Sequence, residues 1–152
     1  MVTLIEGNLF DTKAGIICHQ CNCMGIMGSG VALEVKARFP EVFAAYYEDY
    51  TRGLLKLGYV CFAPTGDGRI IANMCGQKKY GYDGKKYTNY DELQQCMNRV
   101  NGYAENNDCK SIAFPYLMSC HLGGGDWSVV SEMIETTFTD FNVEIYRLKK
   151  EN

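Results

Sequence analysis

The alternation of apolar and polar positions along the chain predicts both strands and helices. Strict alternation or a short apolar run indicates a strand, whereas apolar positions three and four apart indicate a helix. The order of these patterns predicts a mixed sheet flanked by helices, the α/β class. The predicted strands are residues 2–6, 16–22, 59–63, 69–74, 112–116 and 143–148, and the predicted helices are residues 29–38, 40–50, 90–106 and 127–138.

Local signals mark the ends of several elements. Phe39 precedes Pro40 and separates the first two helices, because the residue before proline avoids the helical conformation. Residues 65–68 (TGDG) indicate a hairpin turn, and Asn89 with Glu92 forms a capping box for the third helix. The residues expected to meet the core are Val31, Leu33 and Val35 from the first helix and Val42, Phe43, Tyr46, Tyr47 and Tyr50 from the second.

Two glycine-rich stretches, residues 27–31 and 119–125, each follow an apolar strand and precede a predicted helix. Glycine lets the backbone adopt positive φ and approach a ligand, and the first N–H groups of a helix are free to bind a phosphate. Either stretch alone is equally well explained as a plain strand–helix turn. Two such turns at the carboxyl ends of strands converge on one crevice and favour a nucleotide diphosphate. We expect a Cβ at Gly30 or Gly124 to occupy the place of phosphate oxygens.

The length and composition indicate one globular domain over residues 1–152. A net charge of −3 argues against general affinity for nucleic acid, which needs a basic surface. The chain has no apolar run long enough to span a bilayer and no signal peptide, so we expect a cytoplasmic protein with no membrane partner. Residues 76–88 form a polar loop rich in Lys and Tyr, which we interpret as a solvated loop and a candidate cover for a site.

Eight cysteines are present, and we interpret them as reduced, mostly buried thiols. Cys18 and Cys21 have a spacing found in zinc sites, but side chains alternate along a strand and place the two on opposite faces. We therefore expect no metal. Cys120 opens the second glycine stretch, where a phosphocysteine nucleophile could lie. That chemistry needs an arginine to close the loop on the phosphate, and this loop ends in Asp126 instead.

Three stretches together resemble the macrodomain family: residues 7–10 (GNLF), 19–32 (HQCNCMGIMGSGVA) and 123–127 (GGGDW). They are most similar to the branch that processes ADP-ribose-1''-phosphate, which also contains de-ADP-ribosylating members. The resemblance spans nearly the whole chain and implies a three-layer α/β/α fold with a mixed central sheet. It also implies ADP-ribose or ADP-ribose-1''-phosphate as the ligand, with no cofactor, and an ADP-ribosylated macromolecule as a further candidate partner.

The resemblance assigns ligand contacts to particular residues. The first glycine stretch would clasp one phosphate and the distal ribose, the second the other phosphate, and Asn22 the ribose hydroxyls. Asn8 stands where many macrodomains have an aspartate that accepts from the adenine amino group, and Leu148 stands at the adenine edge. The expected ligand-binding residues are Asn8, Leu9, Asn22, Met27, Gly28, Ser29, Gly30, Val31, Ser119, Cys120, His121, Leu122, Gly123, Gly124, Gly125 and Leu148.

Two departures from the family pattern bear on the chemistry. Several hydrolases of this branch use a lysine after the strand that here ends near Met74, but this chain has Gln77 there and Lys78 next to it. An amide cannot form a Schiff base with the opened ribose, so that route depends on whether Lys78 substitutes. His121 replaces a residue that is commonly glycine, and it either reaches the phosphates or caps its loop.

The first hypothesis of function is a phosphatase that removes the terminal phosphate of ADP-ribose-1''-phosphate. His19 would be the general acid or base and Asp126 would orient water, since histidine titrates near neutrality. The alternative for His19 is a strand histidine satisfied by its surroundings, and the alternative for Asp126 is a helix N-cap. The alternative functions are a mono-ADP-ribosyl hydrolase acting on protein or nucleic acid, and a non-catalytic ADP-ribose-binding module.

Overall fold

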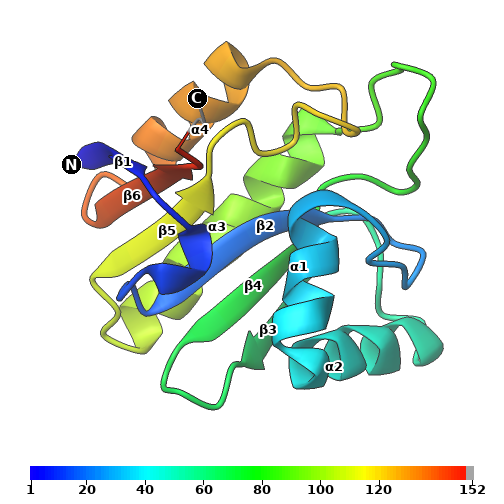
Figure 1. Ribbon diagram of the computed structural model, residues 1–152, viewed down its shortest axis with the longest axis horizontal. Coiled ribbons are helices and arrows are strands. Elements are labelled where there is room, and N and C mark those ends of the chain that lie inside the picture. Colours follow the sequence, from blue (N-terminus) through cyan, green and yellow to red (C-terminus); the bar gives the residue numbers. More distant parts are fainter. Residues whose placement is uncertain (150–152) are drawn as a thin grey trace.

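The computed structural model describes residues 1–149, and its centre is one six-stranded sheet in the order β1-β6-β5-β2-β4-β3 (Figure 1). All neighbouring strands are parallel except β3 and β4, which form an antiparallel hairpin. The strands are β1 (Val2–Glu6), β2 (Ile16–Cys21), β3 (Val60–Pro64), β4 (Ile70–Cys75), β5 (Ser111–Pro115) and β6 (Asn142–Arg147), and the helices are α1 (Gly30–Arg38), α2 (Pro40–Thr51), α3 (Tyr90–Asn106) and α4 (Trp127–Thr137).

The predicted elements are all present, and each of their ends lies within one residue of the prediction. Asn89 accepts a hydrogen bond from the N–H of Glu92 at 3.1 Å and caps α3 as expected. One element was not predicted: a 3₁₀ helix, η1 (Leu9–Asp11), begins after Asn8, whose side chain accepts from the N–H of Phe10 at 2.8 Å.

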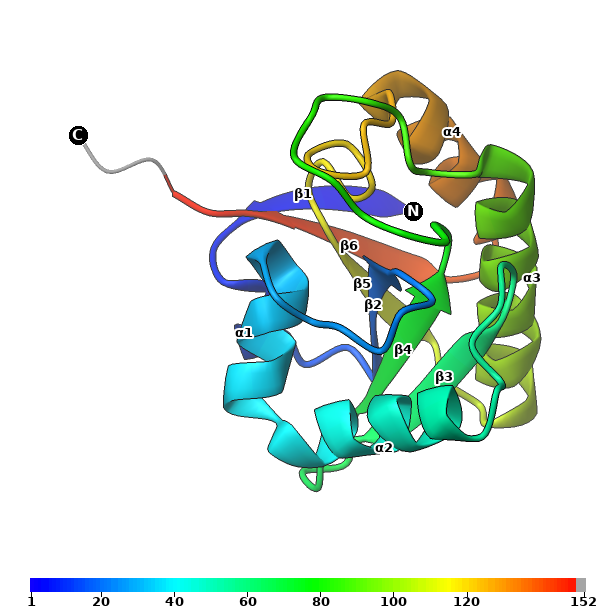
Figure 2. The same ribbon diagram turned by 90° about the vertical axis from the view of Figure 1, so that its right-hand side faces the viewer.

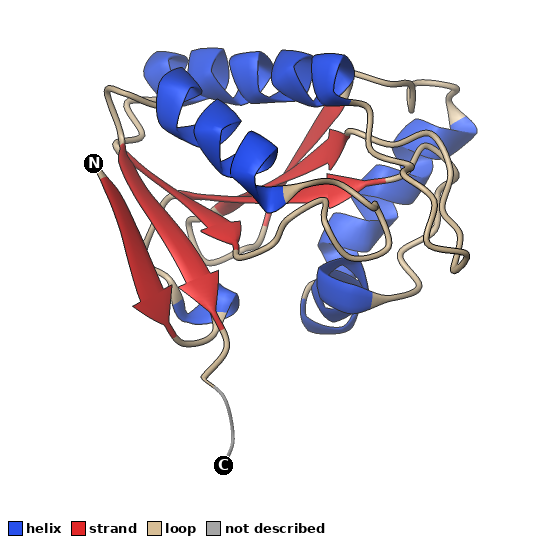
Figure 3. Cartoon of the chain, turned by 90° about the horizontal axis from the view of Figure 1, so that it is seen from above, coloured by secondary structure: helices blue, strands red, loops and turns tan. Residues whose placement is uncertain are grey.

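Helices cover both faces of the sheet and make three layers (Figure 2). α3 and α4 pack on one face in a cluster that includes Met97 and Ile134, and η1, α1 and α2 pack on the other face in a cluster that includes Val35 and Tyr46. The view from above shows the same arrangement, with the sheet running between the two groups of helices (Figure 3). The three-layer α/β/α fold with a mixed sheet is therefore confirmed.

β2 lies between β5 and β4, and its side chains alternate between the two cores. Cys18 is buried against α3 and α4, whereas Cys21 is buried on the side of α1 and α2. The two thiols therefore point away from each other, as predicted, and do not share a metal ion. By the same alternation His19 faces the α1–α2 layer and Gln20 faces the α3–α4 layer. All eight cysteines are free thiols.

The first two helices bury less apolar surface than the pattern suggests. Leu33 was expected to be buried in part and is 47% exposed, whereas Val35 is the fully buried residue of α1. In α2, Tyr46 is fully buried, whereas Tyr47 and Tyr50 are more than 40% exposed. Only part of the aromatic stripe of α2 therefore packs in the core. Its outer rings contact one another along the helix, with Tyr47 and Tyr50 ring centroids 5.8 Å apart.

No helix within residues 1–149 is both long enough and apolar enough to cross a membrane.

Candidate functional site

A pocket with a cavity volume of about 180 Å³, open to solvent on one side, lies at the carboxyl ends of β2 and β5. Three loops build its wall: the β2–α1 loop (residues 22–29), the β4–α3 loop (residues 76–89) and the β5–α4 loop (residues 116–126). The residues of the wall are His19, Gln20, Cys21, Asn22, Ile26, Gly28, Ser29, Gly30, Val31, Ala32, Gln77, Tyr80, Tyr82, Pro115, Tyr116, Leu117, Met118, Ser119, His121, Leu122 and Gly123.

Two runs of backbone N–H groups in this wall have no hydrogen-bond partner within residues 1–149. One run includes residues 30–32, the first turn of α1, where the first helical bond is made only by the N–H of Leu33 to the Ser29 carbonyl at 3.2 Å. The other run is residues 121–123 in the β5–α4 loop. Both glycine-rich stretches therefore present free donors to one pocket, as predicted from their positions after strands.

The β2–α1 loop is held in shape by Asn22. Its side-chain oxygen accepts from the N–H of Met24 at 2.9 Å and from the hydroxyl of Tyr46 at 3.0 Å, and its amide donates to the Ile26 carbonyl at 2.9 Å. Gly25 adopts a φ of +74°, and an added Cβ would lie 2.7 Å from the ring of Tyr50. Asn22 lines the pocket, but its side chain also forms the turn that aims the loop.

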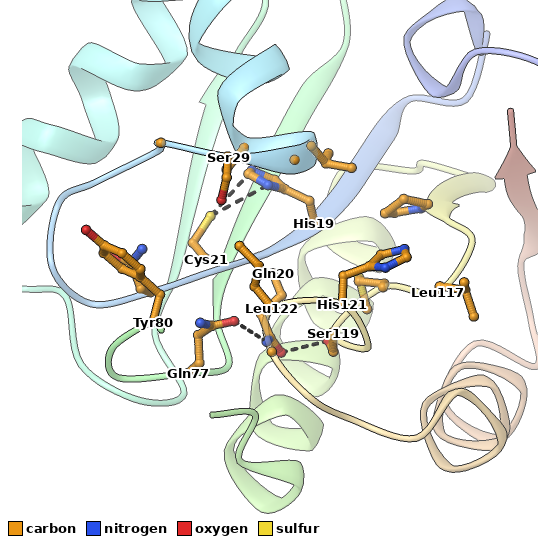
Figure 4. A pocket seen from close by; sticks show the side chains of 18 of the residues that line it. His19, Gln20, Cys21, Ser29, Gln77, Tyr80, Leu117, Ser119, His121 and Leu122 are labelled. Atoms are coloured by element: carbon orange, nitrogen blue, oxygen red, sulfur yellow. Dashed lines mark hydrogen bonds between the residues drawn. The ribbon is translucent and has the colours of Figure 1, made fainter. Parts of the chain in front are cut away.

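Gln20 ties the other two loops together beneath the pocket (Figure 4). Its amide nitrogen donates to the Gln77 side-chain oxygen at 2.6 Å and to the Thr88 hydroxyl at 2.9 Å. Its oxygen accepts from the Ser119 hydroxyl at 2.7 Å, and Thr88 in turn donates to the Ser119 carbonyl at 2.9 Å. One side chain of the central strand thus fixes the β4–α3 loop and the β5–α4 loop relative to each other.

The β4–α3 loop also packs directly on the β5–α4 loop. The N–H groups of Tyr87 and Thr88 both donate to the Gly123 carbonyl, at 2.8 and 2.9 Å. Gly124 has a φ of +69°, and an added Cβ would lie 2.5 Å from the Lys85 carbonyl oxygen. The expectation that Gly124 leaves room for phosphate oxygens is therefore wrong, because the space it leaves is filled by the neighbouring loop.

His19 lies at the base of the pocket and is buried. Burial lowers the pKa of its imidazole to about 4, against a smaller opposing effect of the bond to Asn73. Asn73 donates its amide to the Cys61 carbonyl, so its oxygen is the acceptor for His19 Nε2–H at 2.6 Å. Cys21 Sγ lies 3.7 Å from Nδ1 (Figure 4). His19 is therefore neutral at pH 7 and bonded to protein groups.

His121 differs from His19 in its surroundings. It is exposed, and it lines the pocket from the β5–α4 loop. Cys120, next to it, lies outside the wall, and its thiol donates to the Met118 carbonyl at 3.2 Å. Burial, together with the charge of Asp126, raises the pKa of the Cys120 thiol to about 11. The thiol is therefore protonated at neutral pH, which agrees with the exclusion of a phosphocysteine nucleophile.

Asp126 is the N-cap of α4 and lies outside the pocket wall. One carboxylate oxygen accepts from the N–H of Ser128 at 2.9 Å and from its hydroxyl at 2.8 Å. These bonds lower the pKa of the carboxyl group. Asp126 and His19, expected to share the catalytic work, are not brought together by the fold.

Several other expected ligand contacts also lie outside the pocket wall. Asn8 caps η1, Leu9 and Met27 are buried in the core beneath α1, and Leu148 is 67% exposed beyond β6. The ligand contacts expected of these residues stay predictions. The expected residues that do line the pocket are Asn22, Gly28, Ser29, Gly30, Val31, Ser119, His121, Leu122 and Gly123.

Gln77 and Lys78 point to different surfaces. Gln77 lines the pocket, and both ends of its amide are bonded, the oxygen to Gln20 and the nitrogen to the Lys79 carbonyl at 2.9 Å. Lys78 lines a separate shallow hollow beside Cys23 and Leu55 to Leu57. Within residues 1–149, the pocket wall therefore contains no lysine.

Sequence reasoning missed some of the wall. Gln20 gave no signal, because its role depends on loops far away in the chain. Tyr80 and Tyr82 lay in the loop marked as a candidate cover, and the structure brings both to the pocket with ring centroids 6.1 Å apart. Tyr116 and Leu117 directly follow the β5 strand, and this position could have marked them.

Comparisons with known proteins place this geometry in a family. The DNA ADP-ribosyl glycohydrolase of Mycobacterium tuberculosis is 30% identical over 145 residues, which cover 91% of this chain and 39% of that protein. The ADP-ribose 1''-phosphate phosphatase of Meyerozyma guilliermondii is 29% identical over 113 residues, which cover 68% of this chain and 62% of that protein. This chain thus spans about two fifths of the length of the glycohydrolase relatives it matches.

Among solved structures, the macrodomain of Mycobacterium tuberculosis DarG is 25% identical and superposes with a TM-score of 0.86, covering 98% of this chain and 99% of that one. The family model described as Macro domain matches residues 18–134, a stretch that contains both glycine loops and the β4–α3 loop between them. The sequence match, the superposition and the pocket between the glycine loops agree: the chain belongs to the Macro domain family.

Proposed function

We propose that the protein binds ADP-ribose through its diphosphate and hydrolyses ADP-ribose-1''-phosphate to ADP-ribose and inorganic phosphate. The observation that carries this proposal is the pair of free N–H runs, residues 30–32 and 121–123, in one pocket wall. Backbone N–H groups at a helix N-terminus and in a loop nest bind anions, and two such sets match the two phosphates of a nucleotide diphosphate.

The electrostatics of the wall support an anionic ligand. Within residues 1–149 the wall contains no Asp or Glu that would repel a phosphate. α1 directs the positive end of its dipole at the pocket, and its last turn carries Lys36 and Arg38, which suit the negative end.

The side chains favour phosphate release over a reaction through a lysine Schiff base. Gln77 occupies the place that the family resemblance gives to the lysine, and Lys78 faces another surface. Relatives similar over most of the chain are named DNA ADP-ribosyl glycohydrolases, which supports ADP-ribose attached to DNA as the second candidate substrate. The exposed Tyr82 and the half-buried Tyr80 on the pocket rim could stack on a base there.

The surroundings of His19 argue against its expected role as a general acid. A neutral imidazole can accept a proton but cannot donate one as a general acid. In addition, the Nε2–H of His19 already donates a hydrogen bond to Asn73. This favours the alternative in which His19 is a satisfied strand histidine that joins β2 to β4. Asp126 is likewise favoured as a helix cap.

Calorimetry with ADP-ribose and AMP tests the binding step. The Kd of ADP-ribose should be lower than that of AMP by about tenfold or more. AMP has one phosphate and can engage only one run of donors. Equal affinity for the two ligands would refute the two-run model. Release of inorganic phosphate from ADP-ribose-1''-phosphate then tests the reaction, and release of label from ADP-ribosylated DNA or protein in place of it would favour the second candidate.

Eight free thiols suit a reducing compartment, and this supports the cytoplasmic location that we also propose. Cell fractionation followed by detection of a tagged copy of the protein would test this location.

A further inference from the structure

Two histidines are the basic side chains that line the pocket in the described part of the chain. Within residues 1–149 the wall includes neither Lys nor Arg, and its two histidines lie in opposite environments. His19 is buried and uncharged at pH 7, whereas His121 is exposed to solvent. A diphosphate brings two negative charges into this wall, and His121 is the exposed basic side chain that lines it.

His121 is also in the right place. Its own N–H begins the free run of residues 121–123, so the imidazole is attached to a residue that already presents a donor to the site. Figure 4 shows His121 beside Leu117 on one side of the pocket, with Gln77 and Tyr80 on the other. An anion bound by this N–H run would lie next to the residue that carries the imidazole.

Other charged groups near this loop are engaged elsewhere. Arg147 on β6 lies over the ring of Tyr116 at 5.5 Å and pairs with Glu6 at 3.0 Å. Lys85 pairs with Asp83 at 3.9 Å, and Lys86 lies over the ring of Tyr90 at 4.6 Å. The charged residues on the elements next to the loop include Arg147, Lys78, Lys79, Asp83, Lys85, Lys86 and Asp126, and in the described part of the chain none of these belongs to the pocket wall.

We propose that His121 binds the diphosphate of the ligand as an imidazolium, so that ADP-ribose affinity rises as the pH falls. This inference rests on the proposed function, because it names a side chain of the same diphosphate site. The diphosphate keeps its charges across the range in which histidines titrate, so the proton taken up on binding goes to the protein. A charge-assisted bond to phosphate is about twice as strong as a neutral one, and it exists only while the ring is protonated.

Calorimetric titration of the whole chain with ADP-ribose, from about pH 8 to about pH 5.5, tests the proposal. The Kd of the wild-type protein should tighten roughly tenfold over this range, the difference between a neutral and a charged hydrogen bond. His121→Gln should bind with a Kd that does not change with pH. His121→Lys should bind at the high end of the range as tightly as the wild type does at the low end.

Two further measurements separate the possible outcomes. Titration in buffers of different ionisation enthalpy should detect proton uptake for the wild type and none for either variant. Thermal unfolding of both variants should match the wild type, since His121 is exposed. A wild-type Kd that is flat with pH, or a slope that persists in His121→Gln, would overturn this inference and leave diphosphate binding standing. No binding of ADP-ribose at any pH would overturn the proposed function and this inference together.

Discussion

The hydroxyl of Ser119 donates to the side-chain oxygen of Gln20 at 2.7 Å, and this bond joins residues 99 positions apart in the chain. Gln20 lies in β2, the strand between β5 and β4, and Ser119 lies in the loop whose free amides line the pocket. With Gln77 and Thr88 on the other atom of the same amide, Gln20 sets the distance between two walls of the site.

Replacing Gln20 with Met should therefore disturb the site more than its size suggests. The variant keeps a similar side-chain length but loses three hydrogen bonds and leaves Gln77 and Ser119 without their partner, which should lower the free energy of unfolding by about 2–3 kcal/mol. ADP-ribose affinity should fall as well. Ser119→Ala, the matched control, removes one bond and should cost about 1 kcal/mol. Urea unfolding and calorimetry measure both effects, and equal losses in the two variants would contradict a central role for Gln20.

Gly30 and Gly124 should respond differently to alanine. At Gly30 the φ is +58° and no atom lies within 4 Å of the added Cβ, so Gly30→Ala should cost about 1 kcal/mol of stability and mainly weaken ADP-ribose binding. At Gly124 the Cβ would meet the backbone of Lys85 and Lys86, so Gly124→Ala should cost about 2–4 kcal/mol. Chemical denaturation compares the two, and a Gly124→Ala protein as stable as Gly30→Ala would contradict the packing of these loops.

Asp126 should matter for stability rather than for turnover. Asp126→Ala removes the acceptor for the Ser128 N–H and should lower Tm by roughly 2–4 °C, the usual effect of a lost cap in a chain of this size. Asp126→Asn keeps a cap and should melt close to the wild type. Both variants should retain phosphate release from ADP-ribose-1''-phosphate. A stable but inactive Asp126→Asn would return the carboxylate to the reaction.

Stability should fall on acidification because His19 is buried as a neutral ring. Its pKa is about 4 in the folded protein and near the usual 6.5 when unfolded, so between these values the unfolded chain binds a proton that the folded chain does not. The contribution of His19 is fully present above about pH 6.5 and is lost as the pH falls toward 4, by about 3 kcal/mol in all.

Urea unfolding at several pH values measures this slope, with His19→Gln as the matched control. The variant should be less stable at pH 7 but should lose less stability between about pH 6.5 and pH 4.5 than the wild type. Equal slopes for the two proteins would show that His19 is not the group that titrates.

Lys78 should be dispensable for the reaction, because it faces the hollow next to Leu55 to Leu57 and not the pocket. Lys78→Ala should release phosphate from ADP-ribose-1''-phosphate at the wild-type rate and bind ADP-ribose unchanged. A variant that binds normally but no longer removes ADP-ribose from DNA would assign Lys78 the role of the lysine that Gln77 lacks.

The sequence by itself determined the order and the ends of the helices and strands, because these depend on local periodicity and on caps such as Asn89. It also placed both glycine loops at the carboxyl ends of strands, and it put Cys18 and Cys21 on opposite faces, because side chains alternate along any strand. The resemblance added the ligand, which the pattern of residues alone narrowed only to a nucleotide diphosphate.

Tertiary structure decided the roles of single side chains. Gln20 joins two loops, Gly124 makes room for Lys85, and Asp126 caps a helix outside the pocket wall, and each fact depends on segments far apart in the chain. The difference between the two histidines was decided in the same way. His19 and His121 are the same chemical group, but His19 is buried against Asn73 and stays neutral, while His121 is exposed on the pocket wall, and no local pattern records burial of that kind.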